Sequence, residues 1–264
     1  MRIITFNANG IRAAARKGFF DWLKMQDADV ICIQETKAQS AQLIDDPTFF
    51  PPHYSVYWND AHKKGYSGVA IYTRYPPDSV ITDIGLPMAD SEGRFIQIDL
   101  GKLSIASLYF PSGTMGPHRQ AEKYRFMAHF QECLREYKTT GRDYILCGDW
   151  NIAHQNRDVK NWQANQNMTG FLPEERAWLS KVFDEFGFVD AFRVVNQQDG
   201  QYTWWSQRAR GAFDNNVGWR IDYQIISPTL RFSVKNAMIY RDEKFSDHAP
   251  LVMDYGISQK LWRD

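Results

Sequence analysis

The sequence predicts two packed β-sheets with helices on their outer faces, in a single domain over residues 1–264. Three observations support this fold class. Short apolar runs with strand character are numerous, only a few segments have helical periodicity, and no linker, repeat or low-complexity segment divides the chain. With 44% hydrophobic residues, a chain of 264 residues can bury a sizeable core.

The predicted strands are short apolar runs that stop at polar or turn-forming residues. They are expected at 1–6, 29–33, 54–58, 68–72, 80–86, 95–100, 103–110, 144–147, 219–226, 234–240 and 251–253. The run 29–33 is apolar nearly throughout, so we expect that strand to be buried on both faces.

Three segments carry apolar side chains at helical spacing. One begins at Ile11, one spans 119–137, and one begins near Pro173, where a proline followed by acids is typical of a helix N-terminus. Their apolar stripes are Phe19, Trp22 and Leu23; Phe126, Phe130 and Leu134; and Trp178, Leu179, Val182, Phe183 and Phe186. The polar stretch 155–169 has no strong period and indicates a functional or disordered loop.

Charge and cysteine content narrow the function classes. The formal net charge is zero, so any binding of nucleic acid must depend on a local patch and not on a global attraction. Cys32, Cys133 and Cys147 lie in apolar contexts without metal-ligand spacing, as is typical of reduced cysteines in a cytosolic protein. Neither a signal-like apolar region nor a membrane span is visible, so we expect a cytoplasmic protein without a membrane partner.

The segment Gly148-Asp149-Trp150-Asn151 follows the apolar run 144–147 and is the strongest local candidate for a site. If the strand geometry continues, Asp149 and Asn151 are two residues apart and face the same way. A carboxylate beside a carboxamide can hold a water, a phosphate oxygen or a hard cation. The alternative is an Asx-turn after a strand, which is the commoner meaning of such a sequence.

Further polar residues stand where apolar runs stop, and each has an ordinary alternative when taken alone. Glu35 could be a solvated loop acid, and Asp247-His248 could lie in a surface turn. As a set these side chains offer oxygen ligands for Mg²⁺ or Mn²⁺ and the groups that phosphodiester hydrolysis needs. The set is Asn7, Glu35, Tyr109, Asp149, Asn151, Asp222, Asp247 and His248.

Seven segments, in order and without a large gap, resemble exonuclease III-type apurinic/apyrimidinic endonucleases. They are 34–37, 66–70, 93–95, 109–113, 148–154, 218–223 and 246–250. The resemblance implies the four-layered αββα sandwich of the endonuclease/exonuclease/phosphatase superfamily, two packed mixed sheets flanked by helices as in DNase I. It also implies a monomer that needs Mg²⁺ (or Mn²⁺) and cleaves duplex DNA 5′ to abasic sites, with 3′–5′ exonuclease and 3′-phosphatase activity as further expectations.

The same resemblance implies roles for individual residues. Glu35 binds the metal, with Asn7 close by and Asp247 completing the metal side. Asp149 aligns or deprotonates the attacking water, Asn151 and Tyr109 hold the phosphate, and His248, oriented by Asp222, stabilises charge on the phosphoryl oxygens. Which of Asp149 and His248 takes the proton stays open. Substrate binding is expected at Asn165, Trp204, Trp219 and Ile221.

Trp219 and Ile221 alternate on the predicted strand 219–226 and so share a face, directly before Asp222. Ordinary core packing is the alternative for apolar residues at this spacing. With Trp204 they are candidates for the walls of a small, rigid pocket that accepts an extruded deoxyribose and excludes a normal base.

Two other functions remain open. The catabolite repression control proteins share this fold and act on RNA with a chaperone partner; residues 158–162 and 168–172 resemble that group too. Met168 stands where the nucleases more often carry a polar residue, which places one DNA-backbone contact in doubt. The full catalytic set favours an enzyme over such a regulator. A sugar-phosphate or inositol-phosphate phosphatase would not require the aromatic residues.

Overall fold

The computed structural model describes residues 1–257, so the end of the predicted domain 1–264 and its polar tail, residues 258–264, lie outside the described residues. Two six-stranded sheets form the centre of the fold. The first has the order β11 (Val234–Ile239), β12 (Leu251–Tyr255), β1 (Arg2–Asn7), β2 (Val30–Gln34), β4 (Val69–Thr73) and β3 (Ser55–Asn59). The second has the order β5 (Ser79–Ile81), β6 (Phe95–Leu100), β7 (Leu103–Tyr109), β8 (Asp143–Asp149), β10 (Asp222–Ile226) and β9 (Val189–Asp190).

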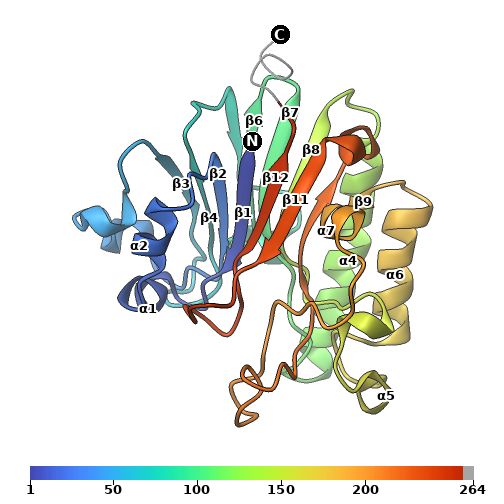
Figure 1. The fold of residues 1–264 in the computed structure, drawn as a ribbon. Coiled ribbons are helices and arrows are strands. Elements are labelled where there is room, and N and C mark those ends of the chain that lie inside the picture. The colour runs from blue at the N-terminus through green and yellow to red at the C-terminus, as the bar shows by residue number, and fades with distance from the viewer. Residues whose placement is uncertain (258–264) are drawn as a thin grey trace.

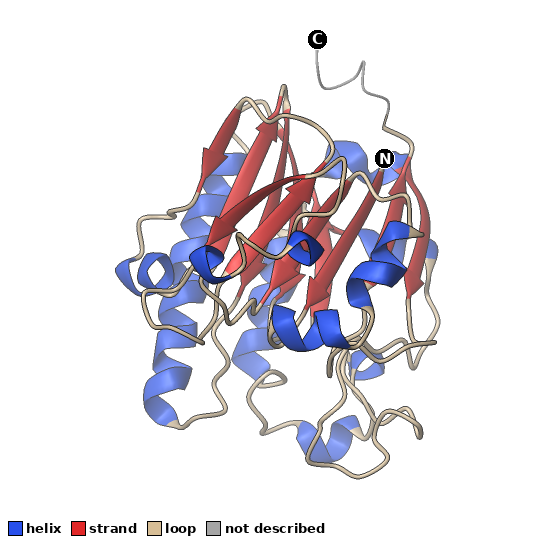
Figure 2. Ribbon diagram, turned by 90° about the vertical axis from the view of Figure 1, so that its left-hand side faces the viewer, coloured by secondary structure: helices blue, strands red, loops and turns tan. Residues whose placement is uncertain are grey.

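Helices cover the outer face of each sheet, which confirms the predicted four-layered αββα sandwich (Figure 1). The helices α1 (Ile11–Arg16) and α2 (Phe19–Lys24) lie on the first sheet, and α4 (Pro117–Tyr137) and α6 (Pro173–Asp184) lie on the second. Shorter elements are α3 (Pro87–Ser91), α5 (Trp162–Asn165), α7 (Ala191–Val195) and the 3₁₀ turns Ser40–Gln42, Pro47–Phe49, Asn156–Asp158 and Pro228–Ser233. Figure 2 shows the strands between the two helical layers.

Alternation along the strands builds three apolar cores from these four layers. In β1, Ile3 points between the two sheets, whereas its neighbour Ile4 packs with Phe19 on the helix side. In β8, Ile145 belongs to the central core and Leu146 to the core beneath α4 and α6. Because every inner strand is covered on both faces, the apolar runs are nearly continuous, as predicted for 29–33.

Each sheet is mixed, and this determines where the strand ends meet. The pairs β1/β2 and β7/β8 are parallel, and the other strand pairs are antiparallel. Parallel neighbours finish at the same edge of a sheet, so β1 and β2 end together, as do β7 and β8. The long loops between 150 and 222 gather at that edge, at the bottom of Figure 1.

Several predicted elements differ in extent. The first predicted helix is two short helices, because Gly18 takes a left-handed φ of 90° between them. The predicted strand 80–86 ends at Ile81, and Leu86 precedes Pro87, the first residue of α3. Phe186 lies beyond the end of α6 and packs on the core from the following turn. The stretch 155–169 holds a 3₁₀ turn and α5.

The strand predicted at 219–226 begins only at Asp222, so the alternation argument for Trp219 and Ile221 was wrong. Trp219 instead makes isolated bridges with Val159 and Trp204, two segments of the loop region. The chain leaves the regular sheet here because its partner β8 ends at Asp149, directly opposite Asp222.

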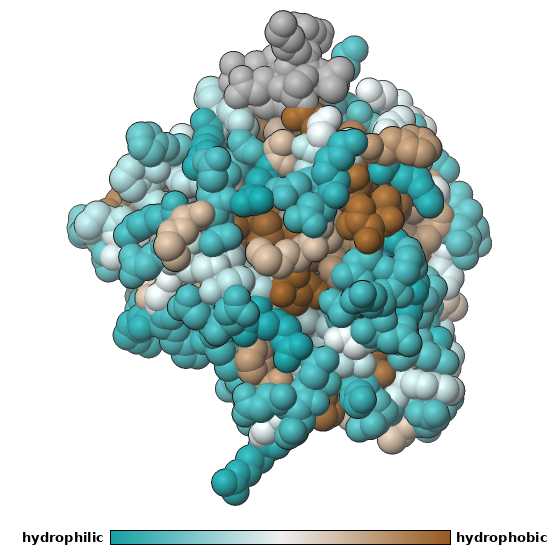
Figure 3. Space-filling model, in the orientation of Figure 1, coloured by the Kyte–Doolittle hydropathy of each residue, from teal (hydrophilic) through white to brown (hydrophobic). Residues whose placement is uncertain are grey.

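The surface in the orientation of Figure 1 is mostly hydrophilic, with hydrophobic side chains in small patches (Figure 3). Among residues 1–257, no helix is long and apolar enough to cross a membrane.

Candidate active site

Both sheets deliver polar side chains to one edge of the fold. Asn7 ends β1 and is paired with Gln34, so that Glu35 follows at the end of β2. In the second sheet, Asp149 ends β8 and is paired with Tyr109 on one side and with Asp222 on the other. These strand-end residues, predicted separately from the sequence, therefore lie together.

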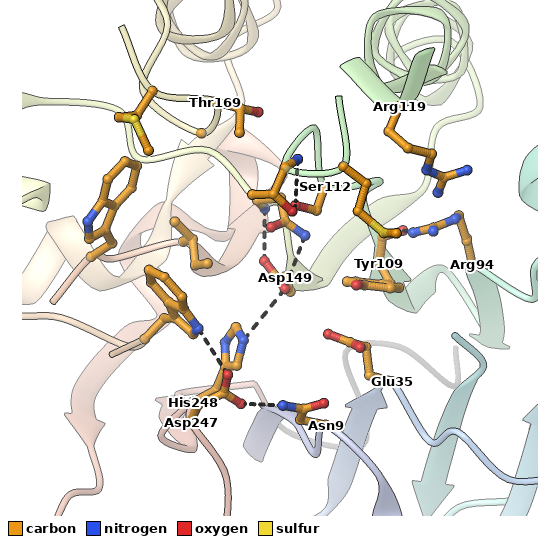
Figure 4. Close-up of a pocket in the computed structure, with 18 of the residues that line it drawn as sticks. Asn9, Glu35, Arg94, Tyr109, Ser112, Arg119, Asp149, Thr169, Asp247 and His248 are labelled. Atoms are coloured by element: carbon orange, nitrogen blue, oxygen red, sulfur yellow. Dashed lines mark hydrogen bonds and ion pairs between the residues drawn. The ribbon is translucent and has the colours of Figure 1, made fainter. Parts of the chain in front are cut away.

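They surround a cleft of about 530 Å³ (Figure 4). Nine of the predicted site residues contribute to its lining: Glu35, Tyr109, Asp149, Asn151, Trp204, Trp219, Ile221, Asp247 and His248. Asn7 and Asp222 are fully buried behind it. Asn165 is not among the lining residues; it lies in α5, where its side chain donates hydrogen bonds to the carbonyls of Lys160 and Asn161.

Asp149 and Asn151 converge because the chain turns, not because the strand continues. The Asn151 backbone is left-handed, with φ of 51°, and its N–H donates to Asp149 Oδ1 at 2.8 Å. This is the Asx-turn that stood as the alternative reading, and it also brings the Asn151 amide to 3.3 Å from Asp149 Oδ2. The same turn therefore forms this part of the site. Gly148 lies within β8, where any Cβ would meet the Leu108 carbonyl oxygen at 1.9 Å.

Asn7 joins the two sheets at the level of the carboxylates. Its Nδ2 donates to Glu35 Oε1 and to Asp149 Oδ2, both at 2.9 Å, and its Oδ1 accepts from the Asn9 N–H. These partners fix the orientation of the amide, because only the nitrogen can donate to two carboxylates. Asn7 thus holds the two acids at a set separation.

Glu35, Asp149 and His248 each place one ligand atom within 4.8 Å of the others. The two carboxylates fit a hard divalent cation such as Mg²⁺, which prefers oxygen ligands. Lys37 also pairs with Glu35, at 2.8 Å from Oε2. Asp247, predicted to complete the metal side, also lines the cleft; its Oδ1 accepts from Asn9 Nδ2 at 2.8 Å and its Oδ2 accepts from Trp204 Nε1 at 3.2 Å.

Burial and neighbouring charges shift the pKa values of Asp149 and His248. Burial, together with the Asp222 and Glu35 carboxylates, raises the pKa of Asp149 to about 8. Burial alone would lower the pKa of His248, but Asp222, at 2.8 Å from Nδ1, and the other nearby acids raise it to about 10. His248 is therefore a cation in neutral solution, and its Nε2 faces Asp149 Oδ2 at 3.9 Å. A protonated imidazole has no lone pair for a metal, so the carboxylates are the ligands that remain.

One wall of the cleft is aromatic. Trp204 and Trp219 meet edge to face, with ring centroids 6.3 Å apart, and Trp219 packs against Phe171 in the same way. Ile221 completes the wall beside them. The wall reaches the acidic side of the cleft through the Trp204–Asp247 hydrogen bond, shown in Figure 4.

The opposite wall carries cationic side chains, none of which was among the predicted site residues. It contains Arg94, whose guanidinium lies 4.6 Å from the Tyr109 ring centroid and donates to the Tyr109 carbonyl at 3.0 Å. Arg94 and Arg119 both donate to the Tyr66 hydroxyl. Other lining cations are Lys37 and Arg208. Lys37, Tyr66 and Arg94 do lie within segments that resemble the nuclease family, and this was the available signal.

Comparison with known proteins agrees with this geometry. The chain matches the model of the Endonuclease/Exonuclease/phosphatase family over residues 4–248. It is 42% identical over 256 residues to an exodeoxyribonuclease of Bacillus subtilis (strain 168), covering 95% of this chain and 98% of that protein. It is 34% identical over 255 residues to a DNA-(apurinic or apyrimidinic site) endonuclease of Dictyostelium discoideum, covering 95% of this chain and 69% of that protein.

Among solved structures, an AP endonuclease from Archaeoglobus fulgidus is similar with a TM-score of 0.86 and 25% identity, covering 97% of this chain and 100% of that chain. The family match covers every lining residue from Asn9 to His248. The chain belongs to the endonuclease/exonuclease/phosphatase family.

Proposed function

We propose that this protein is a metal-dependent DNA repair nuclease that hydrolyses the phosphodiester bond 5′ to an abasic site in duplex DNA. The names of its relatives support a nuclease acting on DNA. The observation that carries the proposal is the arrangement of Asp149, a buried carboxylate with a raised pKa, opposite a His248 that Asp222 keeps protonated. Such a pair offers a base for water and a cation for the phosphate in one cleft.

The proposed metal ligands are Glu35 and Asp149, with Asn7 holding them apart. When bound, Mg²⁺ supplies neutralisation of the phosphate charge. Lys37 ion-pairs with Glu35 and adds a second positive charge at this side of the cleft.

We assign the base to Asp149. A water beside Asp149 can give its proton to this carboxylate, which is free to accept one once the cation has displaced the proton that Asp149 holds below about pH 8. His248 already carries its proton, so its role is to donate a hydrogen bond to a phosphoryl oxygen as negative charge develops there. Asp222 keeps the imidazole charged and oriented.

Asn151 and Tyr109 are proposed to hold the phosphate. The Asn151 amide donates to the Phe110 carbonyl at 2.9 Å and to Asp149 at 3.3 Å; a phosphate oxygen would replace the longer of these bonds. The packing of Arg94 under Tyr109 restricts the phenol to the cleft. Since both sheets supply these groups, we propose that activity requires the predicted single domain as a whole.

The test is a labelled duplex with one abasic analogue, incubated with the purified protein and Mg²⁺, with and without chelator. We expect a single cut on the 5′ side of the lesion, no cut in the matched intact duplex, and no cut in chelator. Asp149→Asn should lower turnover by about 10²–10³-fold while leaving DNA binding intact. A wild-type protein that is inert on this duplex but binds RNA with a partner protein would replace the proposal with the regulator alternative.

A further inference from the structure

Beneath the cleft lies an ion pair that the proposed chemistry does not use. The side chains of Lys123, in the second turn of α4, and Glu175, in the first turn of α6, are both 0% exposed, and Lys123 Nζ lies 2.7 Å from Glu175 Oε1. Lys123 Nζ also donates to the backbone carbonyl of Asn151 at 2.7 Å. A buried lysine therefore contacts a residue that we propose to hold the phosphate.

This pair is not needed to hold the two helices together. The helices α4 and α6 lie next to each other over the second sheet (Figure 1), and they share an apolar core that includes Phe126, Phe130 and Trp178. Removing two charges from water is costly, and well-packed apolar side chains in their place are often neutral or stabilising. Helix packing therefore does not account for this buried ion pair.

The other contacts of Glu175 connect the ion pair to the cleft. Glu175 Oε2 accepts from the Gly170 N–H at 2.6 Å and from the Leu172 N–H at 3.1 Å. Gly170 lines the cleft together with Met168 and Thr169, and we call residues 168–170 the rim. The Gly170 carbonyl accepts from the Ala153 N–H at 2.7 Å, just after the Asn151 turn.

The backbones of Gly170 and Asn151 also lie so close together that a side chain at residue 170 would be crowded. A Cβ on Gly170 would lie 3.1 Å from the Asn151 carbonyl oxygen and 3.2 Å from the Trp219 ring, and Gly170 has a φ of 91°. The Asn151 backbone is itself left-handed, a conformation that costs a non-glycine residue energy. The Lys123 ammonium and the Glu175 carboxylate bind the polar groups on both sides of this contact.

We propose that Lys123 and Glu175 are positioning residues that couple Asn151 to the rim of the cleft. Lys123 holds the Asn151 turn through its carbonyl, Glu175 holds the rim through its N–H groups, and the ion pair fixes one to the other. Neither side chain touches the reacting atoms. This inference rests on the proposed phosphodiesterase function of the same cleft.

The test uses the double variant Lys123→Met/Glu175→Gln. It leaves no unpaired buried charge, and the Gln oxygen can still accept from Gly170 and Leu172. The Gln amide nitrogen replaces Oε1, which accepts from Gln120 Nε2 and Thr169 Oγ1 in the wild type, so the change removes these two bonds together with the hold on Asn151. We expect kcat on the abasic duplex to fall by about 10- to 100-fold, as for a misplaced reacting group, with KM changed by less than about twofold. Leu134→Ala, three turns away on α4 and also fully buried, is the matched control for loss of α4 packing and should retain kcat.

A double-mutant cycle with Asn151→Ala separates positioning from general structural damage. If Lys123 acts through Asn151, adding Lys123→Met/Glu175→Gln to Asn151→Ala should cost less than about twofold more in kcat. Three results would each overturn the inference. They are a kcat in the Asn151→Ala background that falls by the product of the separate losses, an equal fall in kcat in Leu134→Ala, and an unchanged kcat in Lys123→Met/Glu175→Gln.

Hydrogen exchange provides a readout that does not depend on activity. In Lys123→Met/Glu175→Gln, the amides of 151–153 should exchange faster, while the Gly170 amide, which keeps the glutamine oxygen as its acceptor, and the amides of α4 near Leu134 stay protected. An inert wild type would defeat the proposed nuclease function but leave this result interpretable. Unchanged exchange at 151–153 would defeat the coupling itself.

Discussion

Asp222 Oδ2 lies 2.8 Å from Nδ1 of His248, and this buried contact leaves Nε2 facing Asp149. The contact determines both the orientation and the charge of the imidazole. It also links residues from β10 and from the segment just before β12, which belong to different sheets. The charge proposed for His248 and the joining of the two sheets therefore depend on the same hydrogen bond.

The first prediction concerns Asp222→Asn. Without the carboxylate, the pKa of His248 should fall from about 10 toward its ordinary value, and turnover near pH 8 should fall by about 10²-fold as the imidazole loses its charge. The raised pKa in the folded state means that this contact stabilises the protein fully below about pH 6.5 and that the stabilisation is lost as pH rises through 10.

Two measurements check this. NMR titration of the His248 ring in metal-free protein should show the lower pKa, and urea unfolding should depend less on pH between about 6.5 and 10 in the variant. Asp99→Asn, at the far end of the second sheet, is the control. An unshifted His248 pKa would remove Asp222 from the role given to it.

The second prediction links metal binding to pH. Below about pH 8 Asp149 holds a proton, and a cation must displace it. Apparent Mg²⁺ affinity should therefore rise with pH and level off above about 8. Calorimetry at pH 7 in buffers of different ionisation enthalpy should detect the released proton. Asp149→Asn should abolish the release; equal affinity at pH 6 and pH 8 in the wild type would contradict the assignment.

A third prediction concerns Glu35→Gln. Loss of one carboxylate ligand should weaken Mg²⁺ binding by at least about 10-fold and lower turnover, with partial recovery at high Mg²⁺. Titration calorimetry measures the affinity, and Glu132→Gln, an exposed acid on α4, is the matched control. Full activity of the wild type in chelator would rule out a metal-dependent reaction.

The sequence was sufficient for the layers and for the strand-end side chains, because both follow from local patterns. Apolar runs identify strands covered on both faces, and polar residues where they stop identify the edge where Asn7, Glu35 and Asp149 meet. The contacts between these residues were not predictable in the same way. The Asn7–Asp149 hydrogen bond joins residues 142 apart in sequence, so it depends on how the sheets pack.

Two other features show the same limit. Asp149 and Asn151 were paired for the wrong reason: a turn brings them together, and strand alternation does not. Arg94 reads as an ordinary charged residue at the start of a strand, yet it is 1% exposed beneath Tyr109. Side-chain burial of this kind depends on neighbours from other segments, such as Glu92 and Tyr66, which a local pattern does not place.

The last prediction concerns how an abasic site is selected. A deoxyribose without a base is easier to extrude than a stacked nucleotide, and a rigid aromatic wall can enclose it while excluding a base. Trp219 is held in that wall by backbone bridges to Val159 and Trp204 and by edge-to-face contacts with Trp204 and Phe171. Trp219→Ala should therefore slow abasic cleavage more than removal of a 3′-phosphate, because only the first reaction requires a sugar held within a continuous strand. The measurement is the ratio of kcat/KM for the two substrates, in wild type and variant, with native folding checked by near-UV circular dichroism.

Trp162→Ala is the matched control, since Trp162 packs in the same apolar cluster but does not line the cleft. A ratio that stays constant in a folded Trp219→Ala protein would assign this tryptophan to packing alone, and selection would then have to depend on Trp204 and Ile221.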